Sequence, residues 1–359
     1  MREKLHPFQI ALLIYMIQSG VTLFSIPRLS AEAFGTNGWI GLFILFGIVT
    51  LNILLIGLVN KWGKGQSIFV IIENVFPKWL FVPFYLFISV VFTLLATLVA
   101  KKYILLLQML FFRDTPSIVF VGMFFLLSFF LLKGCIYEIG KATVILFFMT
   151  IWTMLLLTFH LSEFSFTRMT TFIMQGEKDI LSGGLNVYSA FLGYELSLFL
   201  IPYAQKNFTK GVFFGNAITS FIYISVSFVC FGFFSFDYLI NDLYPVITLI
   251  EYVKFPFVER VENLIFTLFA LKVLITVVMY LWASKELVSH SFQKLRSNFI
   301  SLFLLTIGTL VSFIPDIIRE VDQWLKWLTY IDVGIAFLLP LLLIFLIGLN
   351  KLKQNKVTL

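Results

Sequence analysis

The sequence predicts an all-α polytopic membrane protein with ten transmembrane helices. Its 359 residues are 60% hydrophobic and only 13% charged, whereas soluble domains are about 45–50% apolar and about 25% charged. Apolar runs of about 20 residues, the length that a helix needs to cross the hydrocarbon core, recur along the whole chain. Together these observations exclude a disordered chain, a secreted disulfide scaffold and a soluble enzyme.

Each predicted helix is an apolar run between charged or turn-forming stretches. The third run is longer than a bilayer requires, which predicts a helix that is tilted or projects past the interface. The runs cover residues 8–28, 38–60, 81–111, 117–133, 141–160, 183–203, 211–235, 262–284, 299–315 and 329–349.

The connections between the runs predict short additional elements. Residues 161–182 form a long polar connection, and Pro245–Lys254 is amphipathic, which predicts a short helix lying on the surface. On the other side of the membrane, the Gly-rich residues 63–67 predict a turn, and residues 68–75 predict a short helix after it. A lone Gly-x-Gly pattern favours a loop here over a phosphate-binding site.

The distribution of Lys and Arg predicts the orientation in the membrane. With the N-terminus in the cytoplasm, the connections on that side carry more Lys and Arg than those on the opposite side, where acidic residues gather. This bias satisfies the positive-inside rule and places both termini in the cytoplasm. The net charge of +7 is therefore a topology signal, and we expect no nucleic-acid partner.

Two helices contain helix-breaking residues near their middles. The first carries Ser19-Gly20 and then Ile26-Pro27, and the sixth carries Gly193 at its midpoint. An unpaired backbone group in hydrocarbon costs several kcal/mol, so a break at mid-depth needs a cavity or a partner. Each glycine alone would also fit close helix packing. The two breaks lie five helices apart, in corresponding positions, which is typical of the binding site of an inverted-repeat transporter.

This pairing predicts two inverted five-helix repeats within one membrane domain that covers residues 1–359. The first repeat spans about 8–160. The second contains helices 6–9 at about 183–315 and helix 10 at 329–349.

The predicted breaks have a specific ligand chemistry. A half-helix that begins near Thr22 would aim its free N–H groups at a carboxylate, and the carbonyl ends near Ser19 and Leu192 would accept hydrogen bonds from an ammonium. A zwitterion such as an amino acid is the expected ligand. The predicted ligand-binding residues are Ser19, Gly20, Val21, Thr22, Gly193, Tyr194 and Glu195.

Ionisable residues inside the spans are further candidates, because they are costly in lipid. Glu195 is predicted to contact the ligand or carry a proton; the alternative is a structural hydrogen bond between helices. Lys272, with Thr276 one turn later, is a candidate for a cation site or for coupling, and the alternative is snorkelling. Lys101 and Lys102 are expected at the outer interface and not in the pocket.

The remaining reactive residues predict no catalytic chemistry. Cys135 and Cys230 have neither a disulfide partner nor metal-ligand spacing, and the histidines form no cluster. We expect no metal, no cofactor and no enzymatic activity. Asp332 lies near the outer end of the predicted tenth helix, where we expect it to be solvated.

Several short motifs, taken in order along the whole chain, resemble those of the B subunits of spore germinant receptors. These motifs are Pro7-Phe8-Gln9, Ser19-Gly20, Ile26-Pro27, Gly63-Lys64-Gly65, Gly193-Tyr194-Glu195 and Phe257-Val258-Glu259-Arg260-Val261-Glu262. That family is similar to the amino-acid permeases of the APC superfamily and shares their fold.

The resemblance implies a protein of the spore inner membrane that senses a small nutrient together with A and C subunits and triggers germination. Its pocket would lie around Ser19–Thr22 and Gly193–Glu195. A working amino-acid transporter, coupled to protons through Lys272 or Glu195, is the alternative, because both functions need the same pocket.

Overall fold

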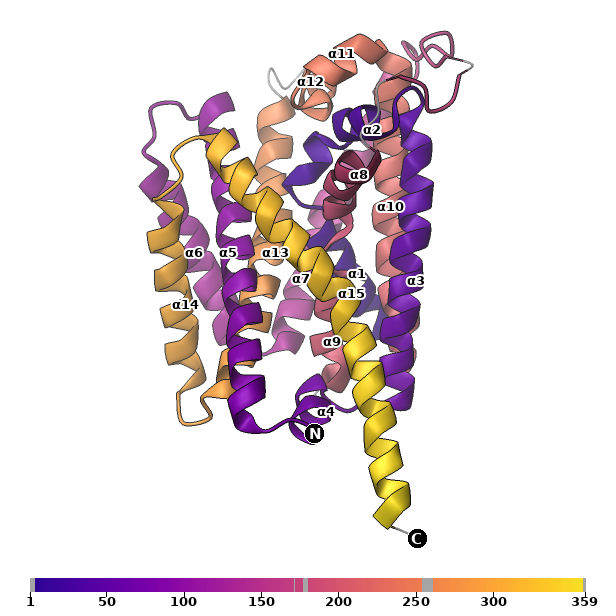
Figure 1. Ribbon diagram of the computed structural model, residues 1–359. Coiled ribbons are helices and arrows are strands. Elements are labelled where there is room, and N and C mark those ends of the chain that lie inside the picture. Colours follow the sequence, from indigo (N-terminus) through magenta and orange to yellow (C-terminus); the bar gives the residue numbers. More distant parts are fainter. Residues whose placement is uncertain (1–3, 171, 177–179, 254–260, 358–359) are drawn as a thin grey trace.

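The computed structural model describes residues 4–170, 172–176, 180–253 and 261–357. Within these residues the chain forms a bundle of helices (Figure 1). The α-helices are α1 Pro7–Gln18, α2 Ile26–Phe34, α3 Gly41–Trp62, α4 Ile68–Glu73, α5 Lys78–Leu110, α6 Ser117–Lys133, α7 Ile136–Ile151, α8 Ile180–Tyr188, α9 Ser197–Leu200, α10 Phe208–Phe233, α11 Phe236–Asn241, α12 Pro245–Glu251, α13 Val261–Ser291, α14 Ser297–Ser312 and α15 Ile318–Val357. The 3-10 helices are η1 Val21–Phe24, η2 Gly38–Ile40, η3 Trp152–His160, η4 Ser189–Phe191, η5 Tyr194–Leu196 and η6 Ile201–Tyr203.

The helices match the predicted membrane-spanning runs. Among the described residues, six helices are long and apolar enough to cross a bilayer, and the pair Ile180–Phe191 and Tyr194–Tyr203, bent by 49°, forms one more broken span. Three shorter apolar helices, α1, α6 and α14, correspond to the other predicted runs. The protein is therefore an all-α polytopic membrane protein, and the count of helices is consistent with the ten predicted.

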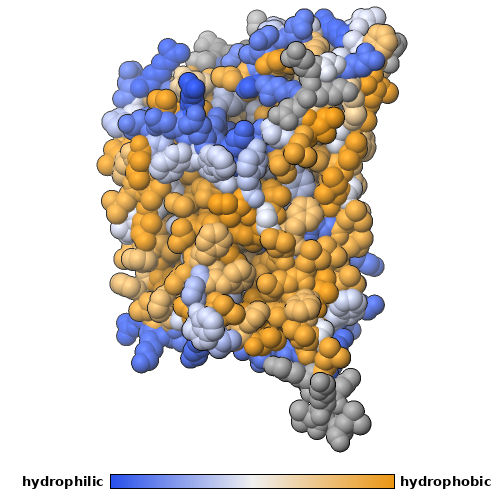
Figure 2. All heavy atoms as spheres, in the orientation of Figure 1, coloured by the Kyte–Doolittle hydropathy of each residue, from blue (hydrophilic) through white to orange (hydrophobic). Residues whose placement is uncertain are grey.

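The surface of the bundle has the pattern that a lipid environment requires. Figure 2 shows an apolar band around the middle, with hydrophilic residues gathered at the two ends. Several large apolar side chains are more than 60% exposed, for example Leu51, Phe130 and Phe221. In water such exposure would favour aggregation, but lipid tails solvate these side chains.

The short connecting elements agree with the sequence. Ser67 caps α4, because its side chain accepts a hydrogen bond from the Phe69 N–H. The helix α12 lies across one end of the bundle (Figure 1), with Val246 and Leu249 buried against the longer helices. The first residues of α1 and the end of α15 lie at the other end (Figure 1).

The last helix differs from the prediction. It begins at Ile318, not near residue 329, because the charged segment before the apolar run continues the helix instead of forming a loop. The expectation that Asp332 is solvated was therefore wrong: Asp332 lies well inside α15 and is fully buried.

Candidate ligand pocket

The first helix is broken at Ser19 and Gly20. The helix α1 ends at Gln18, Gly20 has an extended backbone with φ −85° and ψ −165°, and the chain then turns through η1 into α2. Pro27 lies in the first turn of α2, where its missing N–H leaves no helical hydrogen bond unmade. A Cβ built on Gly20 would meet no described atom within 4 Å, so this backbone faces open space.

The sixth span is broken at Leu192 and Gly193. Leu192 is extended, and Gly193 has φ +111°, a conformation that glycine adopts without strain. A Cβ at Gly193 would lie 2.4 Å from Cγ2 of Ile17, which shows how closely this break packs against the end of α1. The two breaks therefore lie against each other.

Two side chains, Tyr223 of α10 and Gln18 of α1, satisfy backbone carbonyls that the breaks leave free. The Tyr223 hydroxyl lies 2.7 Å from the Gln18 carbonyl and 3.0 Å from the Ala190 carbonyl. The Gln18 amide donates to the Phe191 carbonyl at 2.6 Å and to Asn216 Oδ1 at 3.2 Å. Such partners allow irregular backbone to persist at membrane depth.

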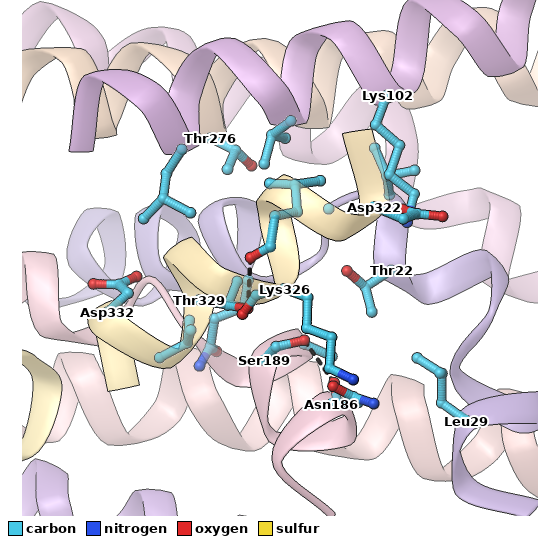
Figure 3. A pocket seen from close by; sticks show the side chains of 18 of the residues that line it. Thr22, Leu29, Lys102, Asn186, Ser189, Thr276, Asp322, Lys326, Thr329 and Asp332 are labelled. Carbon is cyan, nitrogen blue, oxygen red and sulfur yellow. Dashed lines mark hydrogen bonds and ion pairs between the residues drawn. The ribbon is translucent and has the colours of Figure 1, made fainter. Parts of the chain in front are cut away.

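A cavity of about 280 Å³ lies between the two breaks and is also lined by residues of α5, α13 and α15. Its polar lining includes Thr22, Asn186 and Ser189 from the broken segments and Thr329 from α15 (Figure 3). This volume suits a small metabolite. The cavity lies where the sequence predicts a ligand site.

The charges of the cavity are divided between two regions. In Figure 3, Asp332 lies at one side of the pocket, while Lys102 and Asp322 lie together at the other. Lys102 Nζ is 2.7 Å from Asp322 Oδ1. Arg28 and Lys326 also line the cavity. Lys102 was expected outside the pocket; that expectation was wrong, because Lys102 pairs with Asp322 near the start of α15 and lines the cavity.

The predicted site residues fall into two groups. Gly20, Val21, Thr22 and Thr276 line the cavity. Five others are buried behind its wall: Ser19, Gly193, Tyr194, Glu195 and Lys272. The first four residues of the motif Phe257–Glu262, up to Arg260, lie outside the described residues.

The chain has sequence relatives that identify its family. It matches the family described as "Spore germination protein" over residues 4–321. The chain belongs to the spore germination protein family. It is 26% identical over 361 aligned positions to the spore germination protein GerQB of Bacillus cereus, covering 98% of both chains. It is 24% identical to the spore germination protein B2 of Bacillus subtilis (strain 168), with 73% of each chain covered. This is a family of permease-like membrane proteins and not a class of enzymes.

Solved transporter structures share the fold of this germination protein. One is MHP1, a nucleobase-cation-symport-1 family transporter, with a TM-score of 0.61 and 12% sequence identity over 91% of this chain and 75% of MHP1. Another is a Na⁺-coupled sialic acid symporter, with a TM-score of 0.58 and 13% identity over 91% of this chain and 76% of the symporter. The predicted fold class, with its first and sixth helices broken, is confirmed. The limits of the two repeats stay a prediction.

Two residues of α13 join it to the broken first helix. The Lys272 ammonium donates to the Tyr15 hydroxyl at 2.8 Å and lies 5.1 Å from the centre of the Tyr15 ring. The Thr276 hydroxyl lies 3.0 Å from the Ile17 carbonyl and 3.3 Å from the Met16 carbonyl. Lys272 is buried and has no carboxylate within 4.0 Å in the described part of the chain. Its role in coupling stays a prediction.

Glu195 is held by two neighbours behind the pocket wall. Its Oε2 accepts a hydrogen bond from the Gly193 N–H at 2.7 Å, and its Oε1 lies 3.0 Å from the Tyr280 hydroxyl. That hydroxyl also lies 3.0 Å from Oδ2 of Asp332. Tyr280 and Asp332 line the cavity, whereas Glu195 does not.

Sequence reasoning missed Tyr280 and Asp332. Asp332 carried a usable signal, because an ionisable residue within a predicted span is a functional candidate by default. The misplaced start of the last helix hid that signal. Tyr280 carried none, since one tyrosine in an apolar helix is indistinguishable from a packing residue.

Proposed function

We propose that this chain is the nutrient-sensing B subunit of a spore germinant receptor and that the cavity between the two helix breaks binds a small zwitterion of the amino-acid class. The observation that carries the proposal is a cavity with charged and polar lining residues at both breaks of a germination protein with a transporter fold. Its volume of about 280 Å³ suits a small metabolite.

The chemistry of the cavity supports a zwitterion. The open backbone at Gly20, the hydroxyls of Thr22 and Ser189 and the ammonium of Lys326 are suited to a carboxylate. Asp332 supplies the opposite charge at the other side of the cavity. A ligand with both charges would satisfy both regions at once.

The proposed receptor acts in the spore inner membrane with A and C subunits, with both termini in the cytoplasm. The excess of Lys and Arg on the proposed cytoplasmic side supports this orientation. An even number of spans also agrees with termini at one end of the bundle (Figure 1).

Spores that lack this gene, screened against the common amino acids, test the proposal. We expect the mutant spores to lose the germination response to one or a few of them, and the cloned gene to restore it. In parallel, purified protein in proteoliposomes should take up none of the amino acids that trigger germination. Uptake without any germination defect would overturn the proposal in favour of a working amino-acid transporter.

A further inference from the structure

One polar contact joins the predicted site residue Glu195 to two residues that were not predicted, in a chain of three side chains from three helical segments. Glu195 of η5, Tyr280 of α13 and Asp332 of α15 are all at most 5% exposed. The Tyr280 hydroxyl is 3.0 Å from an oxygen of each carboxyl group. Two carboxyl groups therefore share one phenol.

The geometry of this chain requires a proton in addition to that of the phenol. A phenol has a single proton and can donate it to only one of the two carboxyl groups. If both carboxyl groups were ionised, one oxygen contact at 3.0 Å would have no proton, and two buried negative charges would lie close together. In the described part of the chain, no Lys, Arg or His nitrogen lies within 4.0 Å of either group. One carboxyl group therefore carries a proton.

The hydrogen bonds of the pair allow the proton on either carboxyl group, and a bound cation would decide between them. The Gly193 N–H donates to Oε2 of Glu195, which favours the ionised form of Glu195 when no cation is bound. Asp332 lines the cavity, and its buried Oδ1 has no hydrogen-bond partner among the described residues. An ammonium beside Oδ1 would favour ionised Asp332, with the proton on Oε1 of Glu195, so that Glu195 donates to Tyr280 and Tyr280 donates to Asp332.

We propose that Asp332 is the residue of the pocket that binds the cationic end of the ligand, a primary ammonium, and that Glu195 behind Tyr280 holds the proton of the pair when the ammonium is bound. This inference rests on the proposed function for the ligand class. The open Oδ1 is the acceptor for the ammonium. Glu195 is then a positioning residue that does not touch the ligand.

Infrared spectroscopy of the purified protein in lipid nanodiscs, with an amino acid that raises its melting temperature bound, tests the position of the proton. At neutral pH we expect the C=O stretching band of a protonated carboxyl group, which shifts when glutamate side chains are labelled with ¹³C and is lost in Glu195→Gln. A band that shifts only with labelled aspartate would overturn the assignment of the proton to Glu195. The absence of any such band in the wild type would do the same.

Ligand stabilisation tests the role of Asp332. The melting temperature of the purified protein is measured with each common amino acid, and with the matching carboxylic acid that lacks the amine. We expect at least one amino acid, and not its amine-free analogue, to stabilise the wild type. Asp332→Asn should lower the affinity for that amino acid by about ten- to a hundredfold, as expected for loss of a charge-assisted hydrogen bond. Glu195→Gln should retain stabilisation, because Gln can still donate to Tyr280.

Asp322→Asn is the matched control, since Asp322 lines the same cavity from the same helix and pairs with Lys102. It should still prefer the amino acid over the amine-free analogue. Undiminished affinity in Asp332→Asn would overturn the assignment, and so would loss in Glu195→Gln with retention in Asp332→Asn. If no amino acid stabilises the wild type, the proposed ligand class and the ammonium site are both wrong, whereas an infrared band of a protonated carboxyl group would still support the proton shared by Glu195 and Asp332.

Discussion

Gly20 and Gly193 interrupt their helices for different physical reasons. Gly193 has φ +111°, and a Cβ there would lie 2.4 Å from Ile17, so both its conformation and its packing require glycine. Gly20 has φ −85°, which any residue adopts, and a Cβ would meet no described atom within 4 Å. The requirement at Gly20 is thus the space that its missing side chain leaves in the cavity.

We therefore expect Gly20→Leu to abolish the nutrient response while the protein still reaches the membrane at a normal level. The leucine side chain would fill the cavity, and leucine also favours a continuous helix. Germination of spores that carry the variant, normalised to its level by immunoblot, measures the effect. Gly20→Ala adds only a methyl group to open space and should respond nearly as the wild type does. A normal response in Gly20→Leu would place the ligand elsewhere.

We expect Gly193→Ala to lower the melting temperature of the purified protein, because strain of about 1–3 kcal/mol is expected for a left-handed alanine, and the contact with Ile17 adds to it. Gly184→Ala, in the same span, is the control, since a Cβ there meets no described atom within 4 Å. Equal melting temperatures for the two variants would contradict this account of the break.

At the scale of elements, α13 holds the broken first helix in place. Lys272 and Thr276 lie one turn apart on α13 and bond to Tyr15 and to the last carbonyls of α1. A carbonyl at the end of a helix has no partner within that helix, so Thr276 supplies one from outside. These contacts brace the broken first helix against α13.

We expect Lys272→Met to lower both the melting temperature and the nutrient response, even though it removes a charge from an apolar region. The buried Tyr15 hydroxyl would lose its partner, and leaving such a group unpaired costs about 1–3 kcal/mol. A double-mutant cycle with Tyr15→Phe measures the interaction: the two losses should not add. Additive losses, or a fully active Lys272→Met variant, would mean that the lysine contributes nothing through this contact.

At the scale of the whole molecule, the apolar band (Figure 2) and the number of spans set the topology. The helices at both ends of the chain reach the same end of the bundle (Figure 1). Combined with the distribution of Lys and Arg, this arrangement favours cytoplasmic termini.

A fluorescent protein fused to the C-terminus should therefore fluoresce, and alkaline phosphatase fused at the same point should be inactive. A fusion that ends the chain at Gly176, after five predicted spans, should give the opposite result, because that point lies on the outer side. An active phosphatase at the C-terminus would reverse the proposed orientation.

Much of this molecule is determined by local properties of the sequence. The spans follow from the length of apolar runs, because each helix must satisfy its own backbone in lipid. The breaks follow from Gly20, Gly193 and the nearby prolines, which disfavour a continuous helix wherever they occur. Composition alone excludes a soluble enzyme. These features depend only on neighbouring residues, and the structure agrees with them.

Only the tertiary structure decided which polar groups meet. Glu195 and Tyr280 are 85 residues apart, and Tyr280 and Asp332 are 52 apart, so no local pattern could join them. The prediction for Asp332 failed because a charged segment can form either a loop or the polar face of a longer helix. Whether the segment forms a loop or a helix depends on whether its polar side chains can face a cavity, as those of the first turns of α15 do. A cavity exists only once the helices have packed, so the sequence alone could not decide between the two.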